Sequence, residues 1–123
     1  GLGTAAATAA SAYATAAHTH TDSYAMFITA PADKASPGYV VDARVASART
    51  ITNFYVKTES GSCVATLRNI TDNVEIASAT ANTSGASDAS LINTGVTANE
   101  RLGVVISSNS SGVDLQIVVE YTA

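Results

Sequence analysis

The sequence predicts an all-β fold: an eight-stranded antiparallel β-sandwich, jelly-roll-like, behind a short alanine-rich stalk. From residue 23 onward, short segments rich in Val, Ile and Thr alternate apolar and polar residues, the period of a half-buried strand. Clusters of Gly, Pro, Ser and Asn separate them, as expected of turns. Residues 4–17 are almost entirely Ala and Thr and lack the large side chains that a core needs. We therefore expect two parts, a stalk at 1–22 and a head domain at 23–123.

Eight strands follow from this pattern when the head is taken in order. They are expected at 24–30, 39–45, 50–58, 63–70, 74–80, 89–94, 101–107 and 113–121. Two prolines mark 31–38 as a loop, and Gly61 favours a hairpin turn at 59–62. A tight turn is expected at 71–73, and loops at 81–88 and 108–112. The predicted core consists of Phe27, Val41, Phe54, Val56, Leu67, Ile76, Leu91, Val104, Ile106, Leu115, Ile117 and Val119.

The stalk ends in both histidines of the chain. Alanine favours a short helix over 4–17, although an isolated helix of that length is marginal in water, and a flexible linker is the alternative. In an extended backbone His18 and His20 point the same way, about 7 Å apart. Three chains about an axis would offer six imidazoles, enough for an octahedral shell. The pair therefore favours a homotrimer with a metal on its axis; the alternative is two exposed linker residues in a monomer.

Composition excludes several classes of function. The net charge of −4 and the scattered basic residues argue against nucleic acid as a partner. No apolar run is long enough to predict membrane insertion. Cys63 is the single cysteine and is expected to be a buried thiol. Neither a nucleophile triad nor a carboxylate pair across a cleft is apparent, so we expect no enzyme activity.

Strand parity divides the loops between the two ends of the sandwich. If consecutive strands run antiparallel, loops 31–38, 59–62, 81–88 and 108–112 lie at the end away from the stalk, which we name the distal end. Polar loops on a rigid scaffold are where binding usually occurs, although they could equally be solvated surface. Their hydroxyl and amide groups suit saccharides, with tyrosines adding apolar contact. The candidate receptor-binding residues are Tyr39, Tyr55, Ser60, Asn82, Ser84, Asp88 and Asn109.

The stalk also resembles a known family. The segments LGTAAAT at 2–8 and YATAA at 13–17 look like those that recur in the shafts of bacteriophage tail fibres, and His18-Thr19-His20 resembles their HTH element. In some of these fibres, His-x-His pairs from three chains bind a metal on the trimer axis. The resemblance implies iron(II), or nickel or zinc, held by His18 and His20; a six-nitrogen shell suits zinc least. The head resembles small β-sandwich domains at fibre ends.

This resemblance implies a virion protein made in the host bacterial cytoplasm. The leading hypothesis is the C-terminal domain of a trimeric tail fibre that binds a host-cell surface glycan or protein and contacts other virion proteins. One alternative is a head fibre or capsid decoration protein with a structural role. Another is a secreted carbohydrate-binding module, which would not need to be a trimer.

Overall fold

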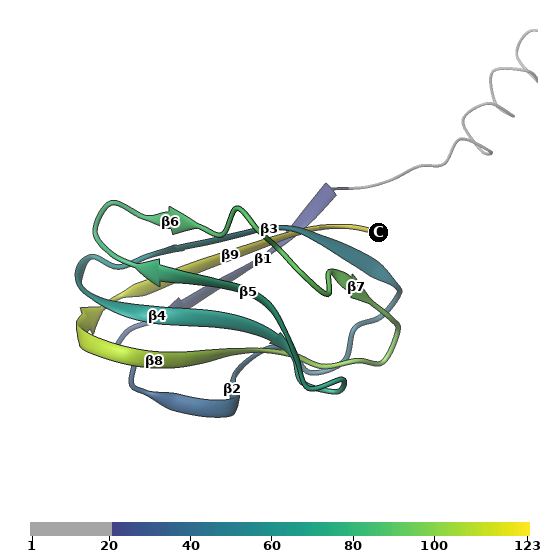
Figure 1. Cartoon of the computed structure of the whole chain (residues 1–123), viewed down its shortest axis with the longest axis horizontal. Helices are drawn as coiled ribbons and strands as arrows, with labels where there is room; N and C mark the ends of the chain where they lie inside the picture. Colours follow the sequence, from purple (N-terminus) through teal and green to yellow (C-terminus); the bar gives the residue numbers. More distant parts are fainter. Residues whose placement is uncertain (1–20) are drawn as a thin grey trace, which may run out of the picture.

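The computed structural model describes residues 21–123, and it consists of two antiparallel β-sheets packed face to face (Figure 1). Within this part of the chain every regular element is a β-strand, so the all-β prediction is confirmed. Accordingly, the described residues contain no helix that could cross a membrane. The predictions for the helical stalk and for His18 and His20 lie outside the described residues.

Nine strands make up the two sheets. They are β1 (Thr21–Ile28), β2 (Lys34–Asp42), β3 (Arg49–Lys57), β4 (Ser60–Asn69), β5 (Val74–Ala81), β6 (Ala86–Ser87), β7 (Gly95–Val96), β8 (Leu102–Val113) and β9 (Leu115–Thr122). The five-stranded sheet has the order β1-β9-β3-β6, with β7 also paired to β3, and the four-stranded sheet has the order β2-β8-β4-β5. All connections except β4–β5 and β6–β7 pass from one sheet to the other, so the two sheets are interleaved along the chain.

The inward faces of the two sheets supply the core. Alternation places Phe54 and Val56 of β3 and Leu67 of β4 in the core between the sheets, and all three are fully buried. Most of the predicted core is confirmed as buried: Phe54, Val56, Leu67, Ile76, Val104, Ile106, Leu115, Ile117 and Val119. Burying side chains of this size contributes about 1.5–3 kcal/mol each, which is the main term favouring the fold.

Phe27 was wrongly placed in the core. Its side chain is 61% exposed, because β1 turns Tyr24, Met26 and Ile28 inward against the core instead. Both faces of this strand carry apolar residues, so alternation alone does not decide which face is buried. Phe27 is therefore an exposed aromatic residue on a sheet that was expected to hide it.

The prediction of eight strands is also wrong in its sixth member. Residues 89–94 do not form a strand, and two short strands, β6 and β7, pair with β3 on either side of that segment. The carboxylate of Asp88 is one reason. One of its oxygens accepts a hydrogen bond from Ser78 N in β5 (2.8 Å), and the other accepts one from Ser90 N (2.7 Å). These bonds hold the chain in a turn beside β5.

Three connections also differ from expectation. Residues 59–62 are not a hairpin turn, because β3 and β4 belong to different sheets. The predicted loop 108–112 belongs to β8, which continues to Val113 through irregular pairing with β4 and positive φ at Ser108 and Ser111. Asp114, at φ 53°, then turns the chain directly into β9. The predicted loop 31–38 is shortened because β2 begins at Lys34.

Candidate functional site

The connections β1–β2, β3–β4, β5–β6 and β8–β9 meet at the distal end, opposite the start of β1 (Figure 1). Backbone hydrogen bonds join them: Glu59 N donates to Val113 O (3.0 Å), Thr58 N to Asn82 O (2.9 Å) and Asp114 N to Thr29 O (3.0 Å). This confirms the grouping of these connections at one end. The distal end is thus a set of short connections fixed to one another.

Asn109 makes hydrogen bonds within the distal end and does not project from it. Its backbone N donates to Asp33 Oδ1 (2.9 Å), its Nδ2 donates to Pro31 O (2.9 Å), and its Oδ1 accepts from Gly112 N (3.1 Å). The side chain is thereby fixed on both sides of its amide, which orients it toward the head. Its role in the structure is to tie β8 to the β1–β2 connection.

Ser60, Asn82 and Ser84 also lie at the distal end. Asn82 Oδ1 accepts a hydrogen bond from Ser84 N (3.0 Å), which closes the turn between β5 and β6. Ser60 begins β4, opposite Val113, and both Ser60 and Ser84 are exposed. Of the seven predicted residues, these two present hydroxyl groups to solvent at the distal end most directly.

The remaining predicted residues are set back from the distal end. Asp88 holds the edge of β5. Tyr39 lies within β2 opposite Val104, packs partly on the core, accepts a hydrogen bond from Ala32 N (3.3 Å), and has Lys34 Nζ 4.9 Å from its ring centroid. Tyr55 lies in β3 beside β6, and the backbone of Gly85 packs directly on its hydroxyl. Both tyrosines therefore contact the distal connections from within their strands: Tyr39 contacts the β1–β2 connection, and Tyr55 contacts the β5–β6 connection.

Sequence reasoning missed a polar cluster at the other end, which we name the proximal end. Tyr24 Oη donates a hydrogen bond to Asp42 Oδ2 (2.6 Å) and accepts one from Arg49 Nη1 (2.6 Å). Tyr24 and Arg49 belong to the five-stranded sheet and Asp42 to the four-stranded sheet, so the cluster bridges the two sheets. No local pattern marks these residues, because each comes from a different strand.

Aromatic rings complete the proximal cluster. The guanidinium of Arg49 lies 4.5 Å from the ring centroid of Tyr121 and 5.8 Å from that of Tyr24, within reach of cation–π attraction. The two tyrosine rings are 4.9 Å apart and tilted by 37°. Burial raises the pKa of Tyr24 most, and its hydrogen bond to Asp42 raises it further, whereas the charge of Arg49 lowers it. The phenol therefore stays protonated and can keep donating to Asp42.

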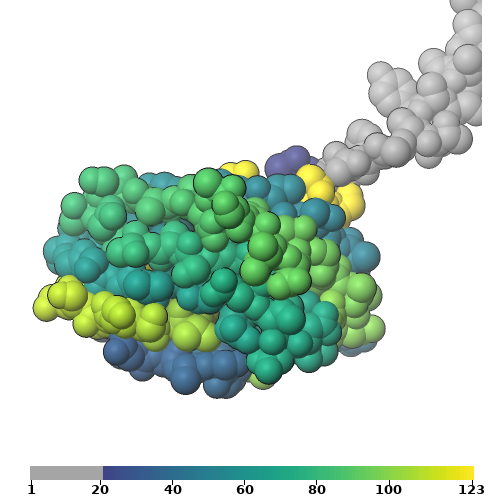
Figure 2. Space-filling model, in the orientation of Figure 1, coloured from purple at the N-terminus to yellow at the C-terminus, as the bar shows by residue number. Residues whose placement is uncertain are grey.

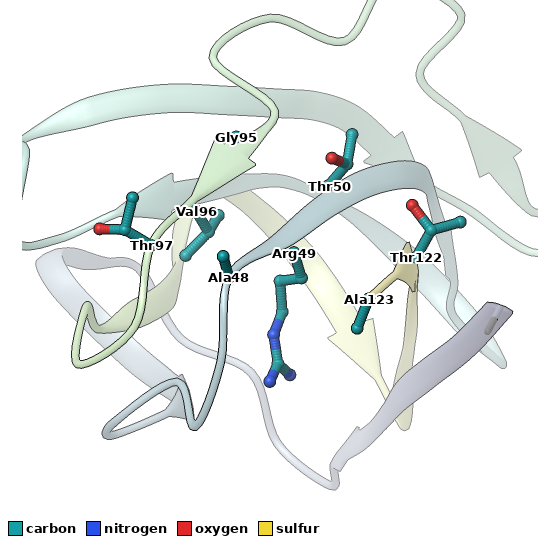
Figure 3. Close-up of a pocket in the computed structure, with 8 residues that line it drawn as sticks. All are labelled: Ala48, Arg49, Thr50, Gly95, Val96, Thr97, Thr122 and Ala123. Atoms are coloured by element: carbon teal, nitrogen blue, oxygen red, sulfur yellow. The ribbon is translucent and has the colours of Figure 1, made fainter. Parts of the chain in front are cut away.

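A shallow pocket of about 550 Å³ opens beside this cluster (Figure 3). Arg49 stands between the C-terminal residues Thr122 and Ala123 on one side and Val96 and Thr97 on the other. Arg49 is its one charged lining residue among those described, and its guanidinium is already bonded to Tyr24 and to Ser47 O (3.0 Å). The pocket therefore lacks the convergent free polar groups of a small-molecule site.

Two carboxylates meet elsewhere at the proximal end. Glu100 is buried, and its Oε1 accepts hydrogen bonds from Thr97 N (2.6 Å) and Thr97 Oγ1 (2.8 Å). These bonds lower the pKa of Glu100 to about 2. A hydrogen bond with Glu100 raises the pKa of Asp72, whose backbone N is held by Asn69 Oδ1 (3.1 Å). The pair joins the β4–β5 turn to the β7–β8 connection.

Neither end assembles a catalytic or metal constellation from the residues that the structure describes. Among residues 21–123, no three or more His, Cys, Asp or Glu side chains are grouped so as to hold a metal ion. Cys63 is buried, as expected, and burial raises the pKa of its thiol. The metal predicted at His18 and His20 stays a prediction. No protein-family model, curated protein or solved structure matches this chain.

Proposed function

We propose that this chain is the C-terminal part of a trimeric bacteriophage tail fibre whose head binds a host-cell surface receptor through its distal end. One observation carries the proposal: four connections meet, mutually braced, at the end opposite Thr21, where the preceding stalk residues enter the head. A fibre needs this polarity, with attachment at one end and contact at the other. The resemblance of residues 2–20 to fibre shafts supports the same orientation.

The strand order supports the finer description as a jelly roll. The order β1-β9-β3 with β6 and β7 faces the order β2-β8-β4-β5, and most connections cross between the sheets. Jelly rolls of this kind occur in viral capsid and lectin domains. A trimer held by iron(II), nickel or zinc at His18 and His20 would place three such heads side by side, with their distal ends facing the host.

A glycan is the receptor class that suits the distal end best. Ser60 and Ser84 expose hydroxyl groups; Ser60 is paired with Val113 of β8, and the turn that carries Ser84 is held by Asn82 Oδ1 and by the bond from Thr58 N to Asn82 O. Fixed loops lose little conformational entropy on binding, and a trimer would present three such ends at once, so that weak single contacts would add up.

Matched surface variants test this assignment. Thr83 and Ala98 are both exposed turn residues, the first at the distal end and the second at the proximal end. We expect Thr83→Arg to reduce adsorption of virions to host cells by about tenfold or more by obstructing the contact, and Ala98→Arg to leave adsorption within about twofold of the parent. Equal adsorption by parent, Thr83→Arg and a deletion of 24–123 would contradict the proposal.

One observation favours a structural role instead. The polar side chains of Asn82, Asp88 and Asn109 are all bonded to backbone within the head, which serves rigidity as well as it serves recognition. A capsid decoration protein or head fibre would need that rigidity alone. Electron microscopy of virions carrying a labelled head separates the two, since the label lies at the tail in one case and on the capsid in the other.

A further inference from the structure

The four outer edges of the two sheets are protected very differently. An exposed strand edge offers unpaired N–H and C=O groups to other chains, and proteins usually protect it with short strands, proline, lysine, bulges or a covering loop. The edge of the five-stranded sheet opposite β1 consists of β6 and β7, which have two residues each. That edge is too short to recruit another strand.

Both edges of the four-stranded sheet are also protected. β2 carries Lys34 and Pro37, and its pairing with β8 shifts register twice. β5 is covered by the following segment: Ile92 N donates to Ile76 O (2.9 Å), and Asn93 Nδ2 donates to Glu75 O (2.9 Å). Asp88 adds its bond to the backbone of β5.

The edge of β1 is protected near its start alone, where the exposed Asp22 carries a charge and its Oδ1 accepts a hydrogen bond from Ser23 N (2.8 Å). Its eight residues pair with β9 without a register shift, and its sequence contains no proline, lysine or glycine. Eight residues extend about 27 Å along the edge. Phe27 is 61% exposed on the outer face of the same strand, and the neighbouring Ala25 is exposed as well. A long, regular, partly apolar edge of this kind requires a covering partner to prevent aggregation.

The position of β1 in the chain indicates which partner. Residues 1–20 lead directly into Thr21, the first residue of β1, so chains joined through their stalks bring their β1 strands together before any other element. The start of β1 lies beside the C-terminus at the proximal end (Figure 2). The exposed residues Ala25 and Phe27 are uncharged. A contact through them avoids like-charge repulsion between identical chains of net charge −4, and it offers no charge to an ionic partner.

We propose that neighbouring copies of this chain cover the edge of β1, and that the three Phe27 side chains meet near the trimer axis. This inference rests on the trimer proposed above. It adds a head-to-head contact, so that trimer formation does not depend on the stalk and its metal alone.

A charge substitution at Phe27 tests the contact. In Phe27→Asp, three carboxylates would be forced together, and we expect the mass of the full chain measured by sedimentation equilibrium in the presence of a chelator to fall from three chains to one. The matched control is Ile92→Asp, since Ile92 is 51% exposed but lies beside β5; it should remain trimeric. Circular dichroism confirms that both variants are folded.

Disulfide trapping gives a second, independent readout. Thiols of Phe27→Cys near a three-fold axis should form a disulfide between two of the three chains on mild oxidation, because cross-linking requires Cα atoms within about 7 Å. A non-reducing gel should then show linked pairs and single chains in a 2:1 mass ratio. Ile92→Cys should stay single, and the buried Cys63 should not react.

The outcomes separate this inference from the function on which it rests. A wild-type chain that sediments as one copy without chelator overturns the proposed trimer and the contact together, whereas one that is trimeric without chelator and single with it overturns the β1 contact alone. A trimeric wild type whose Phe27→Asp variant is equally trimeric, or whose Phe27→Cys variant does not cross-link, overturns the β1 contact and leaves the fibre-head proposal intact.

Discussion

The two ends of the sandwich are stabilised by different chemistry. At the distal end, short side chains such as Asn82 and Asn109 bond to nearby backbone groups, and no described side chain there is both buried and charged. At the proximal end, Tyr24 bonds both to Arg49 and to Asp42 of the other sheet, and the buried Glu100 accepts hydrogen bonds from Thr97 within the β7–β8 connection. Backbone bracing fixes the shape of a surface, whereas a bridge between sheets resists their separation.

This difference would serve the two tasks of the fibre head proposed above. In that proposal the stalk precedes Thr21, so a pulling force would act on β1 at the proximal end. The bond from Tyr24 in β1 to Asp42 in the other sheet lies three residues from that point, where it would oppose peeling of the strand. The distal end needs only a constant shape. Four predictions, in order of decreasing effect, test whether the ends differ in this way.

The largest effect is expected at Gly61 in the distal end. Its φ is +66°, and a Cβ added there would overlap the carbonyl of Ser111. Gly61→Ala should therefore lower the free energy of unfolding by about 2–4 kcal/mol, through left-handed strain and overpacking. The proximal control is Gly95→Ala, where a Cβ would meet nothing within 4 Å and stability should be unchanged or rise by up to about 1 kcal/mol. Urea unfolding of both variants decides; equal losses would contradict the close packing at Gly61.

The next effect is expected at the bridge between the sheets. Tyr24→Phe removes the hydroxyl that bonds both Asp42 and Arg49, which should cost about 1–3 kcal/mol of stability because both partners are charged. Tyr121→Phe is the matched control, since its hydroxyl makes one exposed bond of 3.4 Å to Asp22, and it should cost less than about 0.5 kcal/mol. Similar thermal unfolding of the two variants would mean that the bridge does not stabilise the proximal end.

The third prediction concerns acid stability. The pKa of Glu100 is about 2 in the folded chain, below its ordinary value of 4.5, because Thr97 donates two hydrogen bonds to the carboxylate. Its contribution is present above pH 4.5 and is lost as the pH falls toward 2. Asp72 acts in the opposite sense, since its pKa is raised and its contribution is lost as pH rises. Glu100→Gln should thus flatten the acid side of the stability curve, and Thr97→Val should flatten it partly. An unchanged curve in Glu100→Gln would contradict this assignment.

The smallest effect is expected at the exposed distal hydroxyls. Ser84→Ala and Ser60→Ala should each change the free energy of unfolding by less than about 0.5 kcal/mol, because neither side chain is buried. Asn82→Ala should cost about 1 kcal/mol, because its side chain holds the turn at Ser84 N. Host adsorption measured on the same variants would show whether the two serines act in binding while leaving the fold intact. A large loss of stability in either serine variant would contradict their exposure.

The sequence predicted those features that depend on local pattern. Alternation identified the sandwich and placed Phe54, Ile117 and their neighbours in the core, and strand parity grouped the distal connections. It misplaced Phe27 because β1 is apolar on both faces. It also predicted a strand at 89–94, where the Asp88 carboxylate holds a turn instead. The Tyr24–Asp42–Arg49 bridge was beyond reach, since it joins three strands whose pairing appears only in the folded chain.

The most direct test of the account is the solution mass of residues 1–123, measured by sedimentation equilibrium with and without a chelator. We predict a particle of three times 12.4 kDa in both conditions, because the β1 contact holds the heads together after the chelator has removed the bound metal. A particle of 12.4 kDa in both conditions would contradict the trimeric fibre head.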